Sequence, residues 1–276
     1  MICVSFHRRV CLLAGLFIAI LACRPAAAME MPALTPGEII QKALQRAGSS
    51  DTRVTSHDYL YNRHTVNETL DDQGRLRERK EKLFEVQLQS GLSHQKLIEL
   101  NGQPIPEDEL KKQSERELAQ RQKQPADAKP QKVWSDTESL LTSDLVEKYN
   151  FTLAGVKQLN GRDTYVLAFQ PKSHLPVHKF NDRVLNHVGG TIWIDALEFE
   201  VARVQARLQS EVTLWGGMLG TVRTGSYTVE RTRLPDGAWF DRFSRGVFEG
   251  RKLLEPMLIR TRCEFSNFRP AAPAMQ

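Results

Sequence analysis

The pattern of apolar and polar positions predicts one helix followed by a long β-hairpin. Thr35-x-x-Glu38 is a capping box that opens an apolar stripe at helical spacing, and Gly48 ends this helix. From about residue 53 the period changes to two, as expected for a strand. This period predicts a hairpin formed by the runs Tyr59–Thr69 and Arg75–Gln89, which a polar turn joins. The second arm of the hairpin has one solvent-exposed face.

The middle of the chain predicts one short strand and two further helices. The strand is Lys96–Leu100, and a mostly solvated helix with a Pro-containing linker follows as an insert near 106–132. Beyond the insert, Ser135-x-x-Glu138 is a second capping box. It precedes an apolar stripe over Leu140–Tyr149, which predicts a second amphipathic helix.

The C-terminal half alternates between apolar and polar residues, which predicts half-buried antiparallel strands. Ala202–Gln209 and Met257–Phe265 show the alternation over eight or more positions, and turn signals such as Gly189-Gly190 separate the segments. The further strands are predicted at 165–169, 191–195, 212–214, 226–233 and 239–247. We expect a mainly β (α+β) fold of about nine to eleven strands. With two or three helices to cover them, the antiparallel sheet should be strongly curved and incompletely closed.

The N-terminus predicts export. Residues 1–28 have basic residues, then the apolar run Val10–Cys23 and a small-x-small ending, as in a signal peptide. This run is too short for a bilayer core, which needs about 20 residues. We expect periplasmic localisation, a single domain over 29–270 and a tail over 271–276. Ile20-Leu21-Ala22-Cys23 also approximates a lipobox, so a lipid anchor at Cys23 is the second alternative.

Charge and chemistry exclude several classes of protein. The formal charge is +5, but the signal peptide holds three arginines and no acid, so the mature chain is nearly balanced, unlike a nucleic-acid-binding protein. His174 and His178 have Pro176 between them, and no third metal ligand is identifiable. Cys263 is in phase with apolar neighbours, which indicates a buried thiol rather than a nucleophile. We expect no catalytic residue, no metal and no cofactor.

The order of signal, helix, long hairpin, insert and consecutive strands resembles the LolA/LolB lipoprotein-carrier superfamily, outer membrane lipoprotein-sorting proteins of the periplasm. The local likenesses are Phe151–Phe169, Thr191–Leu208, Gly225–Trp239 and Phe265–Phe268. The resemblance implies an unclosed half-barrel with a helical lid whose concave face receives acyl chains. The same fold also serves as a sensor domain in envelope-stress regulators. The longer hairpin and the insert depart from the carrier pattern.

The apolar strand faces are the candidate lipid-binding site. They either form a filled core or line a cavity of roughly 300–1,000 Å³, the usual range for small-molecule sites. The candidate residues are Phe84, Val86, Leu88, Tyr165, Leu167, Phe169, Val204, Leu208, Ile259 and Phe265.

A second candidate surface lies between two predicted strands. Leu214, Trp215, Met218 and Leu219 are apolar where a turn is normally polar. They either contact a membrane or partner protein, or fold inward as a bulged strand, which is the more common fate of apolar residues. The charges at 75–82 favour a solvated hairpin arm over a basic binding patch.

The leading hypothesis from the sequence is a non-enzymatic periplasmic protein that binds a lipid or a lipoprotein acyl chain. Its partner would then be the acyl chain, with a membrane-bound envelope protein as a further candidate and no nucleic acid. The alternative is a sensor or protein-interaction module of the cell envelope, in which the core is filled and the charged hairpin and the insert carry the function.

Overall fold

The computed structural model describes residues 34–48, 59–89, 92–122, 140–173, 180–214, 220–252 and 255–271. These residues belong to one compact unit that starts at Leu34. Its helices are α1 (Pro36–Gly48), α2 (Glu107–Gln122), α3 (Ser143–Lys148) and α4 (Phe180–Leu185). Its strands are β1 (Tyr59–Leu70), β2 (Leu76–Gln89), β3 (Leu92–Leu100), β4 (Gln103–Pro104), β5 (Tyr149–Leu159), β6 (Arg162–Pro171), β7 (Val188–Asp195), β8 (Val201–Leu208), β9 (Val212–Leu214), β10 (Gly220–Arg233), β11 (Trp239–Lys252) and β12 (Glu255–Pro270).

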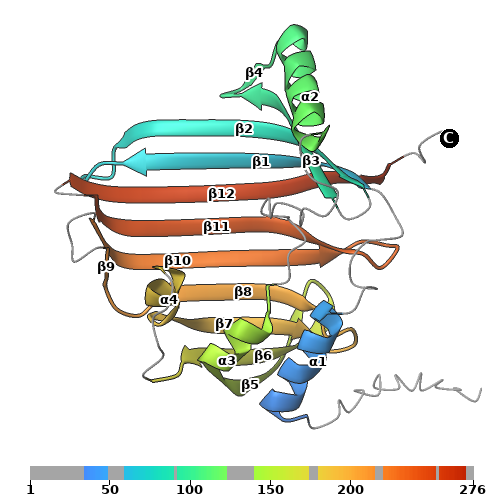
Figure 1. Ribbon diagram of the computed structural model, residues 1–276. Helices are drawn as coiled ribbons and strands as arrows, with labels where there is room; N and C mark the ends of the chain where they lie inside the picture. The colour runs from blue at the N-terminus through green and yellow to red at the C-terminus, as the bar shows by residue number, and fades with distance from the viewer. Residues whose placement is uncertain are drawn as a thin grey trace, which may run out of the picture. The chain divides into compact units, whose positions relative to one another are not determined.

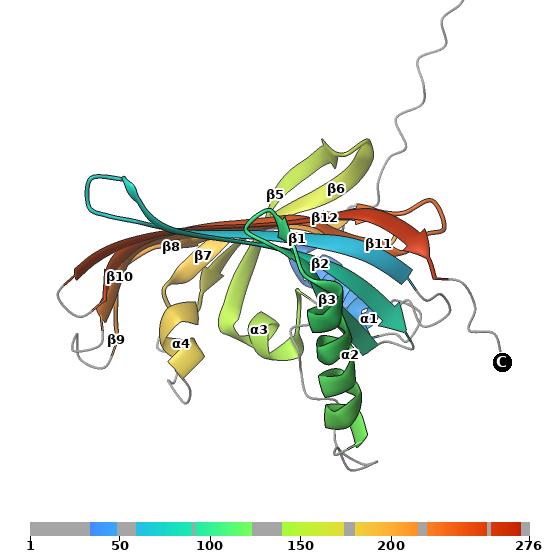
Figure 2. The same ribbon diagram turned by 90° about the horizontal axis from the view of Figure 1, so that it is seen from above.

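All the described strands form one 12-stranded antiparallel sheet in the order β4-β3-β2-β1-β12-β11-β10-β8-β7-β6-β5, with β9 paired to β10 (Figure 1). The sheet does not close, because β4 and β5 lie at opposite edges. Figure 2 shows that the sheet is twisted and that α1, α2, α3 and α4 lie on one side of it. We call this side the helix face and the other side the open face. The mainly β, curved and unclosed sheet predicted from the sequence is confirmed.

The long hairpin forms as predicted because Asp71 organises its turn. One Asp71 carboxylate oxygen accepts hydrogen bonds from the backbone N–H groups of Gln73 and Arg75, at 3.0 and 2.8 Å. The other accepts from the Arg75 guanidinium at 2.8 Å. Gly74 takes a φ of +77°, which a side chain would disfavour. The turn therefore fixes the register of β1 against β2, and β12 then pairs with the other side of β1.

Helix α1 also forms as predicted, through both halves of its capping box. The backbone N–H of Thr35 donates to Glu38 at 2.8 Å, and that of Glu38 donates to the Thr35 hydroxyl at 3.3 Å. The Glu38 carboxylate accepts hydrogen bonds from the backbone N–H and from the hydroxyl of Thr35, and both lower its pKa. The apolar stripe of the helix buries Ile39, Ile40 and Ala43 on the helix face, beside β5.

The second amphipathic helix is shorter than predicted and has a different cap. Helix α3 starts after Thr142, whose hydroxyl accepts from the backbone N–H of Leu145 at 3.3 Å, and the predicted cap at 135–138 lies outside the described residues. Tyr149 is not helical but opens β5, where its hydroxyl donates to the Leu185 carbonyl at 2.8 Å. Burial raises the pKa of Tyr149 to about 12. Tertiary packing of this one aromatic ring thus ends the helix earlier than the apolar spacing indicates.

Two further predictions from the sequence are wrong. Gly189 and Gly190 lie inside β7 rather than in a turn. A Cβ at Gly190 would come 2.8 Å from the Phe169 ring and still closer to the backbone of β8, so glycine is required by close packing. The described chain also has more strands than the nine to eleven expected, and a fourth helix, α4, because one- or two-turn elements leave little periodicity in a sequence.

One core cluster holds the hairpin to the end of the chain. Tyr59 and Tyr61 of β1, Val86 of β2, Phe240 of β11 and Phe265 of β12 are all buried there. The Phe240 ring lies 4.9 Å from that of Tyr59 and 5.7 Å from that of Tyr61, at tilted and edge-on angles. Aromatic pairs at such separations are favourable beyond the apolar area that they bury. Phe240 therefore links strands that are far apart in sequence.

Phe240→Ala should lower the free energy of unfolding by about 3–5 kcal/mol, because it leaves a cavity among aromatic rings. Val247→Ala is the control, since Val247 lies on the same strand and is 43% exposed. The control should change stability by less than about 0.5 kcal/mol. Urea unfolding followed by tryptophan fluorescence measures both. Equal effects of the two substitutions would contradict the assignment of this cluster as a core.

Candidate functional site

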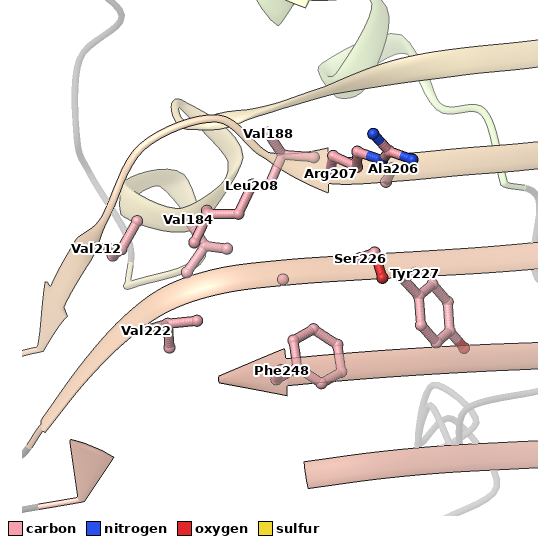
Figure 3. Close-up of a pocket in the computed structure, with 11 residues that line it drawn as sticks. Val184, Val188, Ala206, Arg207, Leu208, Val212, Val222, Ser226, Tyr227 and Phe248 are labelled. Atoms are coloured by element: carbon pink, nitrogen blue, oxygen red, sulfur yellow. The ribbon is translucent and has the colours of Figure 1, made fainter. Parts of the chain in front are cut away.

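An apolar pocket opens on the helix face between α4 and the middle of the sheet (Figure 3). Its volume is about 190 Å³. A cross-strand row forms its floor, because Val188 of β7 pairs with Leu208 of β8, and Gly225 of β10 pairs with Phe248 of β11. Val184 of α4 lines the pocket from the helix side. The pocket is also lined by Ala206, Arg207, Val212, Val222, Ser226 and Tyr227.

The hollow exists because glycine interrupts the apolar row. A Cβ added at Gly225 would lie 3.6 Å from the Leu208 Cβ and 3.2 Å from the Phe248 ring. A larger side chain at this position would occupy the space between these two neighbours. At Gly246 on the next strand the space is instead filled, because a Cβ there would be within 3.0 Å of the Phe248 and Tyr227 rings. The missing side chain of Gly225 thus leaves a recess in a surface that is otherwise continuous.

Three of the lining residues have polar side chains: Arg207, Ser226 and Tyr227. Tyr227 lines the pocket on β10, and burial raises the pKa of the Tyr227 phenol, partly offset by a hydrogen bond with Ser244. The phenol is therefore neutral at physiological pH. Because the other eight lining residues are aliphatic, aromatic or glycine, the pocket suits an apolar guest rather than an ion.

The ten predicted lipid-binding residues are divided between filled core and pocket. Among them, Leu208 lines the pocket, and Ile259 pairs with Phe248 directly beside it. The fully buried members, which are part of the packed interior, are Val86, Tyr165, Leu167, Phe169 and Phe265. Phe84 and Val204 are half-buried in their strands, and the side chain of Leu88 lies outside the described residues.

The second predicted surface, formed by Leu214, Trp215, Met218 and Leu219, lies almost wholly outside the described residues. Leu214 ends β9, but its side chain and the residues Trp215, Met218 and Leu219 lie outside the described residues. Their contact with a membrane or partner stays a prediction. The sequence neighbours on both sides of this segment, Val212 and Val222, are partners in the β9–β10 pairing and line the pocket.

Sequence reasoning missed most of the pocket lining. Val188, Gly225 and Phe248 were not among the candidates, although a glycine inside a strand pattern signals a close approach or a gap. Their shared position depends on strand register, and the periodicity of a single strand does not reveal its partners. Val184 lies in the helix that was not predicted.

The open face carries buried charge. The side chain of Glu230 on β10 is only 2% exposed, yet it accepts from Arg203 at 2.8 Å, from Arg242 at 3.0 Å and from Asn160 at 3.1 Å. Burial acts to raise the pKa of Glu230, but the hydrogen bonds from Asn160 and Arg203 and the two positive charges outweigh it, so the pKa lies below its ordinary value. Glu230 is therefore a paired carboxylate, not a proton donor.

A second charged cluster joins the ends of β6 and β7 to β10. Arg162 donates to the buried Asp195 at 2.5 and 2.9 Å, which raises the pKa of Arg162. Glu198 accepts from Arg233 at 2.6 Å and from the Trp239 indole at 2.8 Å. These buried charges are all paired, as a folded structure requires.

The other candidate reactive groups from the sequence are the thiol of Cys263 and the imidazoles of His174 and His178. The half-buried Cys263 accepts a hydrogen bond from the Thr65 hydroxyl at 3.6 Å, and His174 and His178 lie outside the described residues. Within the described ranges, no three His, Cys, Asp or Glu side chains are placed to hold a metal ion. No described helix is long and apolar enough to cross a membrane.

Comparison with solved structures finds several proteins that are similar to this chain at low sequence identity. A LolA superfamily protein from Nitrosomonas europaea matches with 12% identity and a TM-score of 0.33, covering 87% of this chain and 95% of that one. A DUF1329 family protein from Desulfovibrio piger matches with 12% identity, a TM-score of 0.33 and coverage of 88% and 96%. A domain from Vibrio parahaemolyticus, described as a putative outer membrane lipoprotein-sorting protein domain, matches with 13% identity and a TM-score of 0.30. The match covers 86% of this chain and 94% of that one.

No protein-family model matches the chain, and no curated protein matches it.

Glu230→Gln should lower the free energy of unfolding by about 2 kcal/mol at pH 7, because two arginines lose their carboxylate. Since the folded pKa of Glu230 is lowered, its contribution is present above the unfolded value of about 4.3 and is lost as the pH falls through the folded value. The difference between wild type and variant should therefore shrink below about pH 4.

The control for this prediction is Glu249→Gln, which removes an exposed carboxylate paired with Arg223 at 3.4 Å. It should change stability by less than about 1 kcal/mol at any pH. Chemical unfolding at a series of pH values measures both variants. A Glu230→Gln deficit that stays constant down to pH 3 would show that this carboxylate is not ionised in the fold.

Proposed function

We propose that the chain is a non-enzymatic binding protein of the periplasm, exported by residues 1–28, that holds a lipid or lipoprotein acyl chain on the helix face of residues 29–270. The observation that carries the proposal is the pocket beside Leu208, Gly225 and Phe248. The apolar face is filled under α1 and in the Phe240 cluster, but it stays open here. An open apolar recess in a packed face is the expected form of a binding site.

The size of the pocket sets what it would hold. At about 190 Å³ it is smaller than the 300–1,000 Å³ typical of sites for drug-sized ligands. It therefore suits one section of an acyl chain, with the rest lying along the neighbouring strand face. Burial of about 200 Å² of acyl surface contributes about 5 kcal/mol before ordering costs, enough for reversible binding.

The charged groups support a binding protein rather than an enzyme. Each buried carboxylate described above is neutralised by an arginine, and none of them faces the apolar pocket. A general acid or base needs a pKa near the working pH and reach to a substrate. The lowered pKa of Glu230 is the opposite of what a proton donor requires.

A dansyl-labelled fatty acid tests the proposal. Wild-type protein should blue-shift and enhance its fluorescence, and Gly225→Leu, which fills the recess, should weaken binding about tenfold or more. Leu208→Glu should do the same by placing a charge in the apolar row. Val247→Glu is the matched control, since Val247 lies beside Phe248 in sequence but points to the open face.

The control should bind the probe as the wild type does. Circular dichroism and thermal unfolding of each variant establish that the fold is retained. A wild-type protein that leaves the probe unchanged, or a Gly225→Leu variant that binds it with undiminished affinity, would overturn the proposal.

A further inference from the structure

The open face contains a second and larger hollow, of about 810 Å³. Its floor starts with one row of directly paired residues. Arg203 of β8 lies opposite Glu230 of β10, Glu230 opposite Phe243 of β11, and Phe243 opposite Glu264 of β12. All four residues line the hollow. The described helices lie on the other side of the sheet (Figure 2).

The same row continues across the hairpin. Glu264 lies opposite His64 of β1, His64 opposite Leu83 of β2, and Leu83 opposite Glu99 of β3, and these residues also line the hollow. The hollow is therefore a trough that runs across the strands. At about 4.8 Å between neighbours, the six steps from β8 to β3 span about 29 Å. This length matches about nine residues of extended polypeptide.

One end of the trough is basic. Arg203 and Arg242 share the single carboxylate of Glu230, and Arg245 lies directly opposite Arg262 across β11 and β12. Like charges directly opposite each other are destabilising. Glu264 is 3.7 Å from Arg245 and 3.8 Å from Arg262, so one carboxylate is shared by both. An acidic ligand would relieve this excess of positive charge.

The other end is acidic. Glu81 carries hydrogen bonds from Arg79 at 2.8 Å and with the His64 imidazole at 2.7 Å, and its pKa is lowered by both. Glu99 of β3 has no ion pair or hydrogen-bond partner among the described side chains. Phe243 of β11 and Leu83 of β2 also line the row, and Glu264 and His64 lie between them. The charge of the lining residues thus changes from mainly basic on β8 and β11 to acidic on β2 and β3.

We infer that this trough binds an extended peptide segment of about nine residues that has acidic side chains at one end and basic side chains at the other end. A peptide is the ligand class that presents both signs of charge at this spacing. An anionic membrane fits less well, because it would meet Glu81 and Glu99 as well as the arginines. The inference is independent of the acyl-binding proposal, since the two sites lie on opposite faces.

The test uses a fluorescein-labelled peptide of about nine residues, with aspartates in one half and lysines in the other half. A second peptide of the same composition with alternating charges is the ligand control. Fluorescence anisotropy with the full mature chain should show the blocked peptide binding about tenfold or more tightly than the alternating one. Raising the salt concentration should weaken this binding, because the trough is solvated.

Arg245→Glu and Glu99→Lys should each weaken binding of the blocked peptide about tenfold. Arg245 is 59% exposed and faces Arg262, so reversing its charge should not unfold the protein. Lys80→Glu is the matched control, because it makes the same charge change on the helix face at a side chain that is 60% exposed. It should bind the peptide as the wild type does.

Three results would overturn the inference. The first is equal binding of both peptides, and the second is an equal loss of peptide binding in Lys80→Glu and Arg245→Glu. The third is binding of phosphatidylglycerol vesicles that is lost in Arg245→Glu, together with no binding of either peptide. The last result would assign the basic end to a membrane surface. Fatty-acid binding measured on Arg245→Glu and Glu99→Lys should remain at the wild-type level, so failure of either function is recognised separately.

Discussion

The structure depends on the need to cover one apolar face of a single long antiparallel sheet. A sheet of this kind must curl or accept helices to remove that face from water. Here the helices are short, and α1 covers the strands at one end while aromatic side chains around Phe240 cover the other. The space beside α4 is left between these two filled regions. The pocket is therefore a consequence of too little helix for the length of sheet, increased by Gly225.

The two faces of the sheet carry different kinds of side chain, because alternate residues of each strand point in opposite directions. On β10, Gly225, Tyr227 and Val229 face the helices, whereas Glu230, beyond them at a bulge in the pairing with β11, lies in a cluster of arginines on the open face. A buried carboxylate of this kind costs stability unless it is paired, and its partners Arg203 and Arg242 come from the two neighbouring strands. The pairing ties β8, β10 and β11 together by charge on one face, while Phe248 and Leu208 contribute apolar contacts on the other.

Local signals in the sequence predicted local structure well. The reciprocal hydrogen bonds of Thr35 and Glu38 need only residues of one helical turn, and the Asp71 turn needs only its own loop. The predictions that were wrong involved distant partners. Tyr149 leaves its helix because Leu185 and β6 hold it, and Gly190 is a strand residue because Phe169 crosses it. Prediction of the pocket lining was limited for the same reason. Leu208 was predicted, but its neighbours on β10 and β11 are known only once the register of three strands is known.

An unclosed sheet also has to protect two edges, and this chain does so by different means. A flat edge strand offers unpaired N–H and C=O groups to other chains. At one edge β4 has only two residues and Pro104 removes one donor. At the other edge β5 is long, but its pairing shifts between Leu153 and Gly155, and Gly155 takes a φ of +131° that bends the strand. With both edges blunted, association through added strands is disfavoured, and the two faces are left as the surfaces through which the protein can bind other molecules.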